Sequence, residues 1–269
     1  MGTRLVVVGG GRMGEALTGG LLAAGWGRAD ELCLVETRAE RRRELSERFP
    51  GVAVAKTPPP AEGVVLAVKP GDVVETAGAV AGAGFDRALS IAAGVPLATL
   101  ETALSAEAGR RPVLRAMPNT PALVGAGAAA VAAGTWAGEA DLAWAEQILG
   151  AVGTVVRVPE RLLDAVTGLS GSGPAYLFLV AEALTDAGVL VGLPHEVSAA
   201  LAVQTLLGSA RLLAETGETA SALRAAVTSP GGTTAAGLRA LEAAGVRSAL
   251  VEAVAAATER SRQLGSSNA

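Results

Sequence analysis

The stretch Leu5–Gly14, LVVVGGGRMG, decides the fold of the first half of the chain. Its apolar run Leu5–Val8 predicts a buried strand, and an apolar periodicity after the last glycine predicts a helix. Between them Gly9, Gly11 and Gly14 have the spacing G-x-G-x-x-G. The first glycine permits a tight turn, the second lets the backbone approach a pyrophosphate, and the third lets the helix pack on the strand. This order of parts favours dinucleotide binding.

An acidic residue stands where a dinucleotide-binding unit needs one. A second apolar strand, Leu32–Val35, ends at Glu36, and a residue about twenty positions after the glycines holds a ribose hydroxyl in such units. The helix that follows the glycines also offers N–H groups and a partial positive charge to phosphates. The alternative left open by these residues is a doubly wound domain whose glycine-rich turn binds no ligand.

Strand and helix patterns alternate up to residue 158, which predicts a parallel sheet with helices on both faces. The expected strands are Leu5–Val8, Leu32–Val35, Val52–Ala55, Val64–Val68, Ala88–Ala92, Pro112–Met117, Ala128–Ala132 and Thr154–Val158. In such sheets, ligands bind outside the carboxyl ends of the strands. The segments expected to line that crevice are Gly9–Gly14, Glu36–Arg38, Lys69–Pro70, Ala93–Gly94 and Met117–Thr120.

The pattern changes after Pro159, where no convincing strand remains and alanine-rich helical patterns continue. We therefore predict two domains, residues 1–158 and residues 159–269. Helices that are apolar around most of their circumference must be buried. We expect a second copy of the chain to cover them in a two-fold dimer; a larger monomeric helical core is the alternative.

Composition argues against several classes of protein. Half of the 269 residues are hydrophobic and 18% are charged, which is too apolar for disorder. No uninterrupted apolar stretch approaches the ~20 residues that span a bilayer, and no signal peptide is apparent, so we expect a cytoplasmic protein. A net charge of −4 gives no general attraction to nucleic acid or to anionic membranes. One cysteine and one histidine make neither a disulfide nor a zinc site, and we expect no metal.

Four further features have modest interpretations. Cys33 lies inside an expected buried strand and is interpreted as a core residue, and His195 is interpreted as a surface residue at a helix start. The run Arg41–Arg43, with a glutamate on each side, is interpreted as a solvated helix face. Tyr176, the only tyrosine, either packs or donates a proton.

Two glycine-rich stretches, Ser170–Tyr176 and Thr228–Thr234, precede helices in the second half. Hydroxyls and N–H groups at a helix start form a site for a small carboxylate or phosphate; ordinary capped helix starts are the alternative. No lysine follows Lys69, although hydroxy-acid dehydrogenases usually need a Lys or His to move a proton. A dinucleotide site without an evident acid or base favours reduction of an imine that is already protonated.

Five segments of the chain resemble the Δ1-pyrroline-5-carboxylate reductase family, nearly end to end. They are GGGRMGEAL (9–17), AVKP (67–70), MPNTP (117–121), SGSGPAY (170–176) and TSPGGTTAAGLRALE (228–242). The resemblance implies NAD(P)H-dependent reduction of pyrroline-5-carboxylate to L-proline, the last step of proline biosynthesis, by hydride transfer to the iminium carbon. It also implies an N-terminal Rossmann domain and a C-terminal helical domain that interlocks with a partner. Family members are homodimers, often assembled as five dimers in a decamer.

The resemblance also implies site residues. The loop that holds the substrate carboxylate in the family corresponds to Ser229, Gly231, Gly232, Thr233 and Thr234. Thr234 matches a catalytic position near the ring nitrogen, where proton donation through a water is a hypothesis. With the strand-end segments, the expected cofactor contacts are Gly9, Gly11, Arg12, Met13, Gly14, Glu36, Arg38, Ala67, Val68, Lys69, Pro70, Ala93 and Asn119.

The preferred cofactor depends on two residues that argue in opposite directions. Glu36 hydrogen-bonds a 2′-hydroxyl and repels a 2′-phosphate, which favours NADH. Arg38 pairs with that phosphate, which favours NADPH. We expect NADPH, with NADH also plausible. Two alternative functions remain: reduction of a different cyclic imine acid, and a non-catalytic dinucleotide-binding protein.

Overall fold

The computed structural model describes residues 2–105 and 109–267 and divides into two compact units. The first unit comprises residues 1–172 and 255–269, and the second comprises residues 173–254. The chain therefore enters the second unit once, after Ser172, and returns to the first within its last helix.

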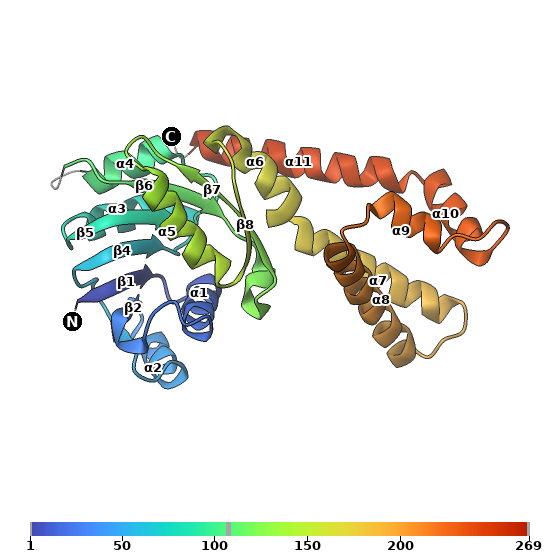
Figure 1. The fold of residues 1–269 in the computed structure, drawn as a ribbon, viewed down its shortest axis with the longest axis horizontal. Coiled ribbons are helices and arrows are strands. Elements are labelled where there is room, and N and C mark those ends of the chain that lie inside the picture. Colours follow the sequence, from blue (N-terminus) through green and yellow to red (C-terminus); the bar gives the residue numbers. More distant parts are fainter. Residues whose placement is uncertain (1, 106–108, 268–269) are drawn as a thin grey trace. The chain divides into compact units, whose positions relative to one another are not determined.

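The first unit contains an eight-stranded sheet in the order β3-β2-β1-β4-β5-β6-β7-β8 (Figure 1). The strands are β1 Thr3–Val8, β2 Leu32–Val35, β3 Ala53–Ala55, β4 Ala61–Leu66, β5 Phe85–Ser90, β6 Val113–Met117, β7 Gly127–Ala133 and β8 Gly153–Arg157. Because β1 pairs in parallel with both β2 and β4, the strand order reverses beside it. Open α/β sheets bind ligands at this switch point. The predicted doubly wound fold is confirmed.

One strand pair departs from the expected parallel pattern. β7 runs antiparallel to β6, and the other pairs of the sheet are parallel. The connection between them holds only the short 3-10 helix Thr120–Val124, whereas a parallel crossover needs about a dozen residues or more. The expectation of a wholly parallel sheet is therefore wrong at this pair.

Helices cover both faces of the sheet. One face packs against α1 Arg12–Ala23, α2 Ala39–Arg48 and α5 Glu139–Gly150, and the other against α3 Val73–Ala81, α4 Leu97–Ser105 and α6 Leu163–Val166. Strand β1 supplies both cores, with Leu5 and Val7 on one face and Val6 and Val8 on the other. All four side chains are buried, as a strand covered on both faces requires.

The second unit is helical, as predicted. It contains α7 Gly173–Leu190, α8 His195–Thr216, α9 Ala220–Ala226, α10 Thr233–Ala243 and the first part of α11 Val246–Ser267. Helices α7 and α8 pack together, and the Ser198 hydroxyl donates to the Thr185 carbonyl oxygen at 2.7 Å. Many large apolar side chains remain exposed, among them Phe178 on α7 at 64% and Leu201 on α8 at 55%.

Two helical stretches, Glu160–Leu190 and His195–Thr216, are long and apolar enough to cross a membrane by length and composition alone. Neither was expected from the sequence, because polar residues interrupt the apolar runs of both stretches. Helices in the cores of soluble proteins pass the same test, but here only 11% of each window is buried. Both stretches therefore need a cover, either protein or lipid.

Candidate functional site

The three positions of the turn after β1 are occupied by glycine for different structural reasons. Gly9 has φ +114°, and a Cβ there would lie 2.5 Å from the Ala67 carbonyl oxygen. A Cβ on Gly14 would collide with the Gly9 carbonyl oxygen. A Cβ on Gly11 would meet no atom within 4 Å. Packing within the protein therefore requires Gly9 and Gly14, whereas Gly11 faces open space.

The start of α1 lies at that open space. Gly11 is its N-cap in an extended conformation and makes no side-chain cap. The N–H groups of the first turn are therefore offered to a ligand rather than to a side chain. Of the two predicted contacts that follow, Arg12 is exposed and Met13 is half-buried. This arrangement fits a pyrophosphate.

The Glu36 carboxylate lies just past the end of β2 and is held by Arg38. Its Oε1 accepts a hydrogen bond from the Arg38 backbone N–H at 2.9 Å and lies 3.4 Å from Arg38 Nε. Burial raises the pKa of this carboxyl, but the hydrogen bonds and the charge of Arg38 outweigh burial, so the pKa lies below its ordinary value. Glu36 is thus an ionised acceptor, and the Arg38 side chain is 70% exposed.

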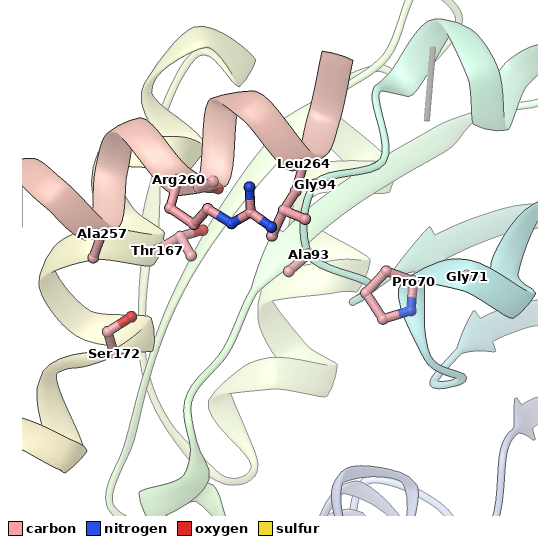
Figure 2. Close-up of a pocket in the computed structure, with 10 residues that line it drawn as sticks. Pro70, Gly71, Ala93, Gly94, Thr167, Ser172, Ala257, Arg260 and Leu264 are labelled. Carbon is pink, nitrogen blue, oxygen red and sulfur yellow. The ribbon is translucent and has the colours of Figure 1, made fainter. Parts of the chain in front are cut away.

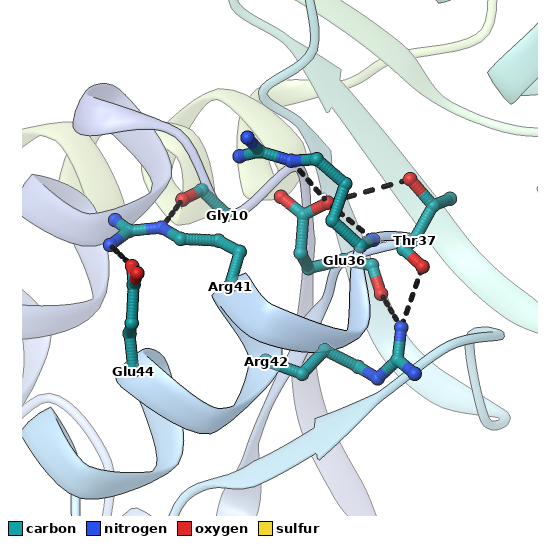
Figure 3. Close-up of polar contacts among 7 residues, drawn as sticks. Gly10, Glu36, Thr37, Arg41, Arg42 and Glu44 are labelled. Atoms are coloured by element: carbon teal, nitrogen blue, oxygen red, sulfur yellow. Dashed lines mark hydrogen bonds and ion pairs between the residues drawn. The ribbon is translucent and has the colours of Figure 1, made fainter.

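Two arginines of the predicted solvated face instead hold this region together (Figure 3). Arg41 Nε donates to the Gly10 carbonyl oxygen at 2.9 Å. Arg42 Nη1 donates to the carbonyl oxygens of Glu36 at 2.9 Å and Thr37 at 2.7 Å. The expectation of a solvated face is therefore wrong for both arginines, because each guanidinium ties the start of α2 to backbone that lines the expected cofactor crevice.

The remaining cofactor residues predicted near the sheet centre follow the carboxyl ends of β4 and β5: Ala67, Val68, Lys69, Pro70 and Ala93. The Ala67 N–H donates to the Val8 carbonyl oxygen at 2.8 Å, so the segment after β4 starts beside the glycine turn. Lys69 and Pro70 are exposed, whereas Ala93 is half-buried. The structure therefore brings these residues to the same edge of the sheet as Glu36.

Asn119 has a structural role that the sequence did not predict. Its side-chain amide donates to the Ser170 carbonyl oxygen at 3.0 Å, and its side-chain oxygen accepts from the Ala128 N–H at 2.8 Å. The residue is 9% exposed. Asn119 thus ties the end of β6 to β7 and to the segment before α7, in addition to any contact with a cofactor.

The first glycine-rich stretch of the second half is not a loop. Residues Thr167–Gly171 form a π-helical turn that runs into α7, and the Ser172 N–H donates to the Thr167 carbonyl oxygen at 2.8 Å. The Ser170 hydroxyl donates to the Val166 carbonyl oxygen at 3.1 Å. Because these groups are used within the helix, the expected anion site at Ser170–Tyr176 is wrong. Such π turns are nonetheless frequent at functional sites.

The second glycine-rich stretch has the expected geometry. The backbone turns at Gly231, with φ +69°, and α10 begins at Thr233 with Gly232 as an extended N-cap. No side chain caps this helix start, so the alternative of an ordinary capped helix does not apply. Thr233 is exposed and Thr234 half-buried. The uncapped N–H groups and nearby hydroxyls suit a small carboxylate.

The other singled-out residues are placed as follows. Cys33 is buried, and burial raises the pKa of its thiol to about 11, which confirms a core residue. His195 is exposed at the start of α8, which confirms a surface residue. The Tyr176 hydroxyl donates to the Ala253 carbonyl oxygen at 3.5 Å, which favours packing. Within residues 2–105 and 109–267, no three His, Cys, Asp or Glu side chains gather as metal ligands.

Comparisons with known proteins cover both halves of the chain. A family model described as pyrroline-5-carboxylate reductase dimerisation matches residues 160–264. A model described as NADP oxidoreductase, coenzyme F420-dependent, matches residues 4–94. A pyrroline-5-carboxylate reductase from Synechocystis sp. is 45% identical and aligns over 98% of this chain and 99% of its own length.

Solved structures agree with these matches. A pyrroline-5-carboxylate reductase from Coxiella burnetii is 34% identical with a TM-score of 0.89, covering 97% of this chain and 98% of that one. A Plasmodium falciparum pyrroline carboxylate reductase with NADP bound is 28% identical with a TM-score of 0.83, covering 98% of both chains.

Proposed function

Since the chain belongs to the pyrroline-5-carboxylate reductase family and catalyses NAD(P)H-dependent reduction of L-1-pyrroline-5-carboxylate to L-proline, we propose which of its residues bind the two reactants. The observation that carries the activity is the 45% identity to a named reductase over nearly the full length of both chains. Neither reduction of another cyclic imine nor a non-catalytic binding role is favoured.

The cofactor lies along the carboxyl edge of the sheet in this proposal. Gly11 and the uncapped start of α1 hold the pyrophosphate, and Glu36 accepts from a ribose hydroxyl. Bound NAD(P)H supplies the hydride. The other proposed contacts are Gly9, Arg12, Met13, Gly14, Arg38, Ala67, Val68, Lys69, Pro70, Ala93 and Asn119. The exposed guanidinium of Arg38 favours NADPH, and the NADP bound to the Plasmodium structure supports this preference.

The substrate carboxylate is held by the segment before α10. Ser229, Gly231, Gly232 and Thr233 surround the uncapped helix start, whose N–H groups stabilise a carboxylate. Thr234, the half-buried residue that follows, holds a water beside the ring nitrogen, and that water relays a proton from solvent to the amine that hydride transfer leaves. We assign cofactor binding to residues 1–158 and dimerisation with substrate binding to residues 159–269.

A second copy of the chain covers the exposed apolar helices. The dimerisation model spans residues 160–264, which include both stretches that are long enough for a membrane. A homodimer buries this surface without lipid, and five such dimers form the proposed decamer. We therefore expect the enzyme in the cytoplasm, with a small-molecule substrate and without a nucleic acid or membrane partner.

The test of the activity follows the oxidation of NADPH and NADH in the presence of pyrroline-5-carboxylate, beside a six-membered cyclic imine acid. Faster turnover of the five-membered substrate is expected, with NADPH as the better cofactor. Reaction with the six-membered imine alone would overturn the substrate assignment. Binding of NADPH without turnover of either imine would overturn the enzymatic function.

A further inference from the structure

The two ends of the proposed cofactor crevice differ in what they can distinguish. One end is a cavity of about 430 Å³ that Pro70 and Ala93 line from the segments after β4 and β5 (Figure 2). The other end is the loop Glu36–Arg38 between β2 and α2. NADPH and NADH differ only by a phosphate on the 2′-oxygen of the ribose that Glu36 is proposed to contact. The preference between the two cofactors is therefore set at the loop.

The half-buried Arg42 holds this loop from α2. Its Nη1 donates to the Glu36 carbonyl oxygen at 2.9 Å and to the Thr37 carbonyl oxygen at 2.7 Å. Figure 3 shows the Arg42 side chain reaching back from the helix to both oxygens. Hydrogen bonds from a charged donor are roughly twice as strong as neutral ones. One guanidinium therefore fixes the orientation of two successive peptide groups.

The orientation of these peptide groups decides what the loop offers to a ligand. In a trans peptide the N–H points away from the C=O, so the N–H groups of Thr37 and Arg38 point away from the Arg42 guanidinium. The Arg38 N–H donates to Glu36 Oε1 at 2.9 Å, which places the Glu36 carboxylate on the same side as these N–H groups. A phosphate that binds beside this carboxylate therefore meets N–H donors rather than carbonyl oxygens, which would repel it.

Glu36 itself is anchored without Arg42. Its N–H donates to the carbonyl oxygen of Ala55 in β3 at 3.0 Å, and its carboxylate accepts from the Arg38 N–H. The peptide group between Thr37 and Arg38 lies beyond the sheet, and Arg42 holds its carbonyl oxygen. Loss of Arg42 should therefore disturb the loop after Glu36 more than the carboxylate that a 2′-hydroxyl needs.

The neighbouring Arg41 contacts a part of the crevice that both cofactors share. Its Nε donates to the Gly10 carbonyl oxygen at 2.9 Å. Its two other nitrogens donate to Glu44 at 2.7 Å and to Glu15 at 2.6 Å. Gly10 belongs to the glycine turn that is proposed to hold the pyrophosphate, a group common to NADPH and NADH. The two adjacent arginines of α2 therefore bind the backbone at different parts of the crevice.

We propose that Arg42 is a positioning residue for the 2′-phosphate of NADPH. It fixes the peptide groups after Glu36 so that Arg38 and the loop N–H groups face that phosphate. Arg42 does not touch the phosphate itself, because its guanidinium lies on the carbonyl side of the loop. The preference for NADPH thus depends on two arginines, one that pairs with the phosphate and one that holds the backbone from which the first projects. The inference rests on the proposed function, which places Arg38 at the 2′-phosphate.

The experiment measures the Kd of the full-length protein for NADPH and for NADH by titration calorimetry. Arg42→Met removes the donors and keeps a long side chain that suits a helix. It is expected to raise the Kd for NADPH about tenfold, as the loss of hydrogen bonds from a charged donor would. The Kd for NADH and the kcat at saturating NADPH should stay unchanged. Arg42→Lys keeps a cationic donor and should restore most of the affinity for NADPH.

The neighbouring arginines of α2 provide matched controls. Arg43→Met alters the exposed next residue and should leave both affinities unchanged. Arg41→Met removes the bond to the glycine turn and should weaken the binding of NADPH and NADH alike. Equal weakening of the two cofactors by Arg42→Met would overturn the proposal, because it would assign Arg42 to the stability of the whole crevice. A fall in Tm with both affinities unchanged would overturn it too.

A double variant separates positioning from the charge of Arg42. If Arg42 acts through the loop that carries Arg38, Arg42→Met should weaken NADPH binding by a smaller factor in an Arg38→Ala background than in the parent. The same factor in both backgrounds would overturn the positioning role, since Arg42 would then act as an independent charge. None of these measurements depends on turnover. A parent protein that binds both cofactors but reduces no imine would therefore contradict the proposed function and leave this inference standing.

Discussion

The Arg38 side chain is held only weakly, because it is 70% exposed and its Nε lies 3.4 Å from the Glu36 carboxylate. A 2′-phosphate offers it a stronger, doubly charged partner. We expect Arg38→Ala to raise the KM for NADPH about tenfold and to change the KM for NADH little, as steady-state kinetics would measure. Arg43→Ala, which removes an exposed arginine of α2, is the control. Equal effects on the two cofactors would remove Arg38 from the phosphate site.

The Glu36 carboxylate links stability to pH. Its folded pKa lies below the ordinary value of 4.5, so its stabilising effect is fully present above pH 4.5 and is lost as the pH falls through the folded pKa. Glu36→Gln should therefore have a lower Tm than the parent at neutral pH, and the difference should shrink in acid. Scanning calorimetry across this range is the measurement. A Tm difference independent of pH would contradict the ionised state.

The role of a single residue was predictable where it follows from the neighbouring sequence. It was not predictable where it depends on a partner far along the chain. Glu36 follows from its place after an apolar strand, and Cys33 follows from its place within that strand. Arg41 is different, because its partner Gly10 lies 31 positions away in the sequence. The neighbouring glutamates, taken alone, indicate that the arginines lie on a solvated helix face. Only the fold reveals that Arg41 binds the Gly10 carbonyl oxygen.

Within the strand–turn–helix unit, substitution by alanine is expected to affect the Tm differently at two of the glycines. Gly14→Ala should lower the Tm strongly, because the new Cβ collides with the Gly9 carbonyl oxygen. Gly11→Ala should leave the Tm nearly unchanged, because no atom lies within 4 Å of its Cβ. It should nonetheless weaken NADPH binding, since the pyrophosphate needs that space. Thermal unfolding and titration calorimetry of both variants test this, and unchanged NADPH affinity of Gly11→Ala would place the pyrophosphate elsewhere.

Element boundaries were predictable where apolar residues are continuous. The strand Leu32–Val35 matches the prediction. Strands β4 and β5 begin earlier than predicted, because Gly63 and Arg87 interrupt their apolar patterns. Trp144 of α5 explains both: its ring fills the space where Gly63 would carry a Cβ, and the Arg87 guanidinium lies 5.6 Å from the ring centre. A contact with a distant helix leaves no local signal.

For the whole molecule, the sequence predicts that the apolar surface of the helices must be covered. It does not predict where the chain divides into its two compact units. The alanine-rich helical patterns, apolar all round, are by themselves enough to indicate a partner. The end of α11 nevertheless belongs to the compact unit of the sheet, where Ser261 bonds Asp164 at 2.7 Å. That contact joins residues 97 positions apart. Helical periodicity does not report such pairings.

The last prediction concerns the proposed subunit interface. Phe178 on α7 is 64% exposed in the single chain, and a dimer would bury it. Phe178→Glu should therefore shift the protein to a smaller species in analytical ultracentrifugation and lower its activity, because a charge buried without a partner is costly. Val74→Glu alters an exposed apolar residue of α3 in the first unit and should leave the assembly unchanged.

The same proteins distinguish a protein partner from lipid. If a partner subunit covers α7, the parent protein should sediment as an oligomer without detergent and should not float with phospholipid vesicles. A parent protein that is monomeric and floats with vesicles would assign the apolar stretches 160–190 and 195–216 to a membrane. An oligomer that Phe178→Glu leaves intact would instead place the interface away from Phe178. The oligomeric state and vesicle binding of two variants and their parent therefore determine what covers the helical half of this reductase.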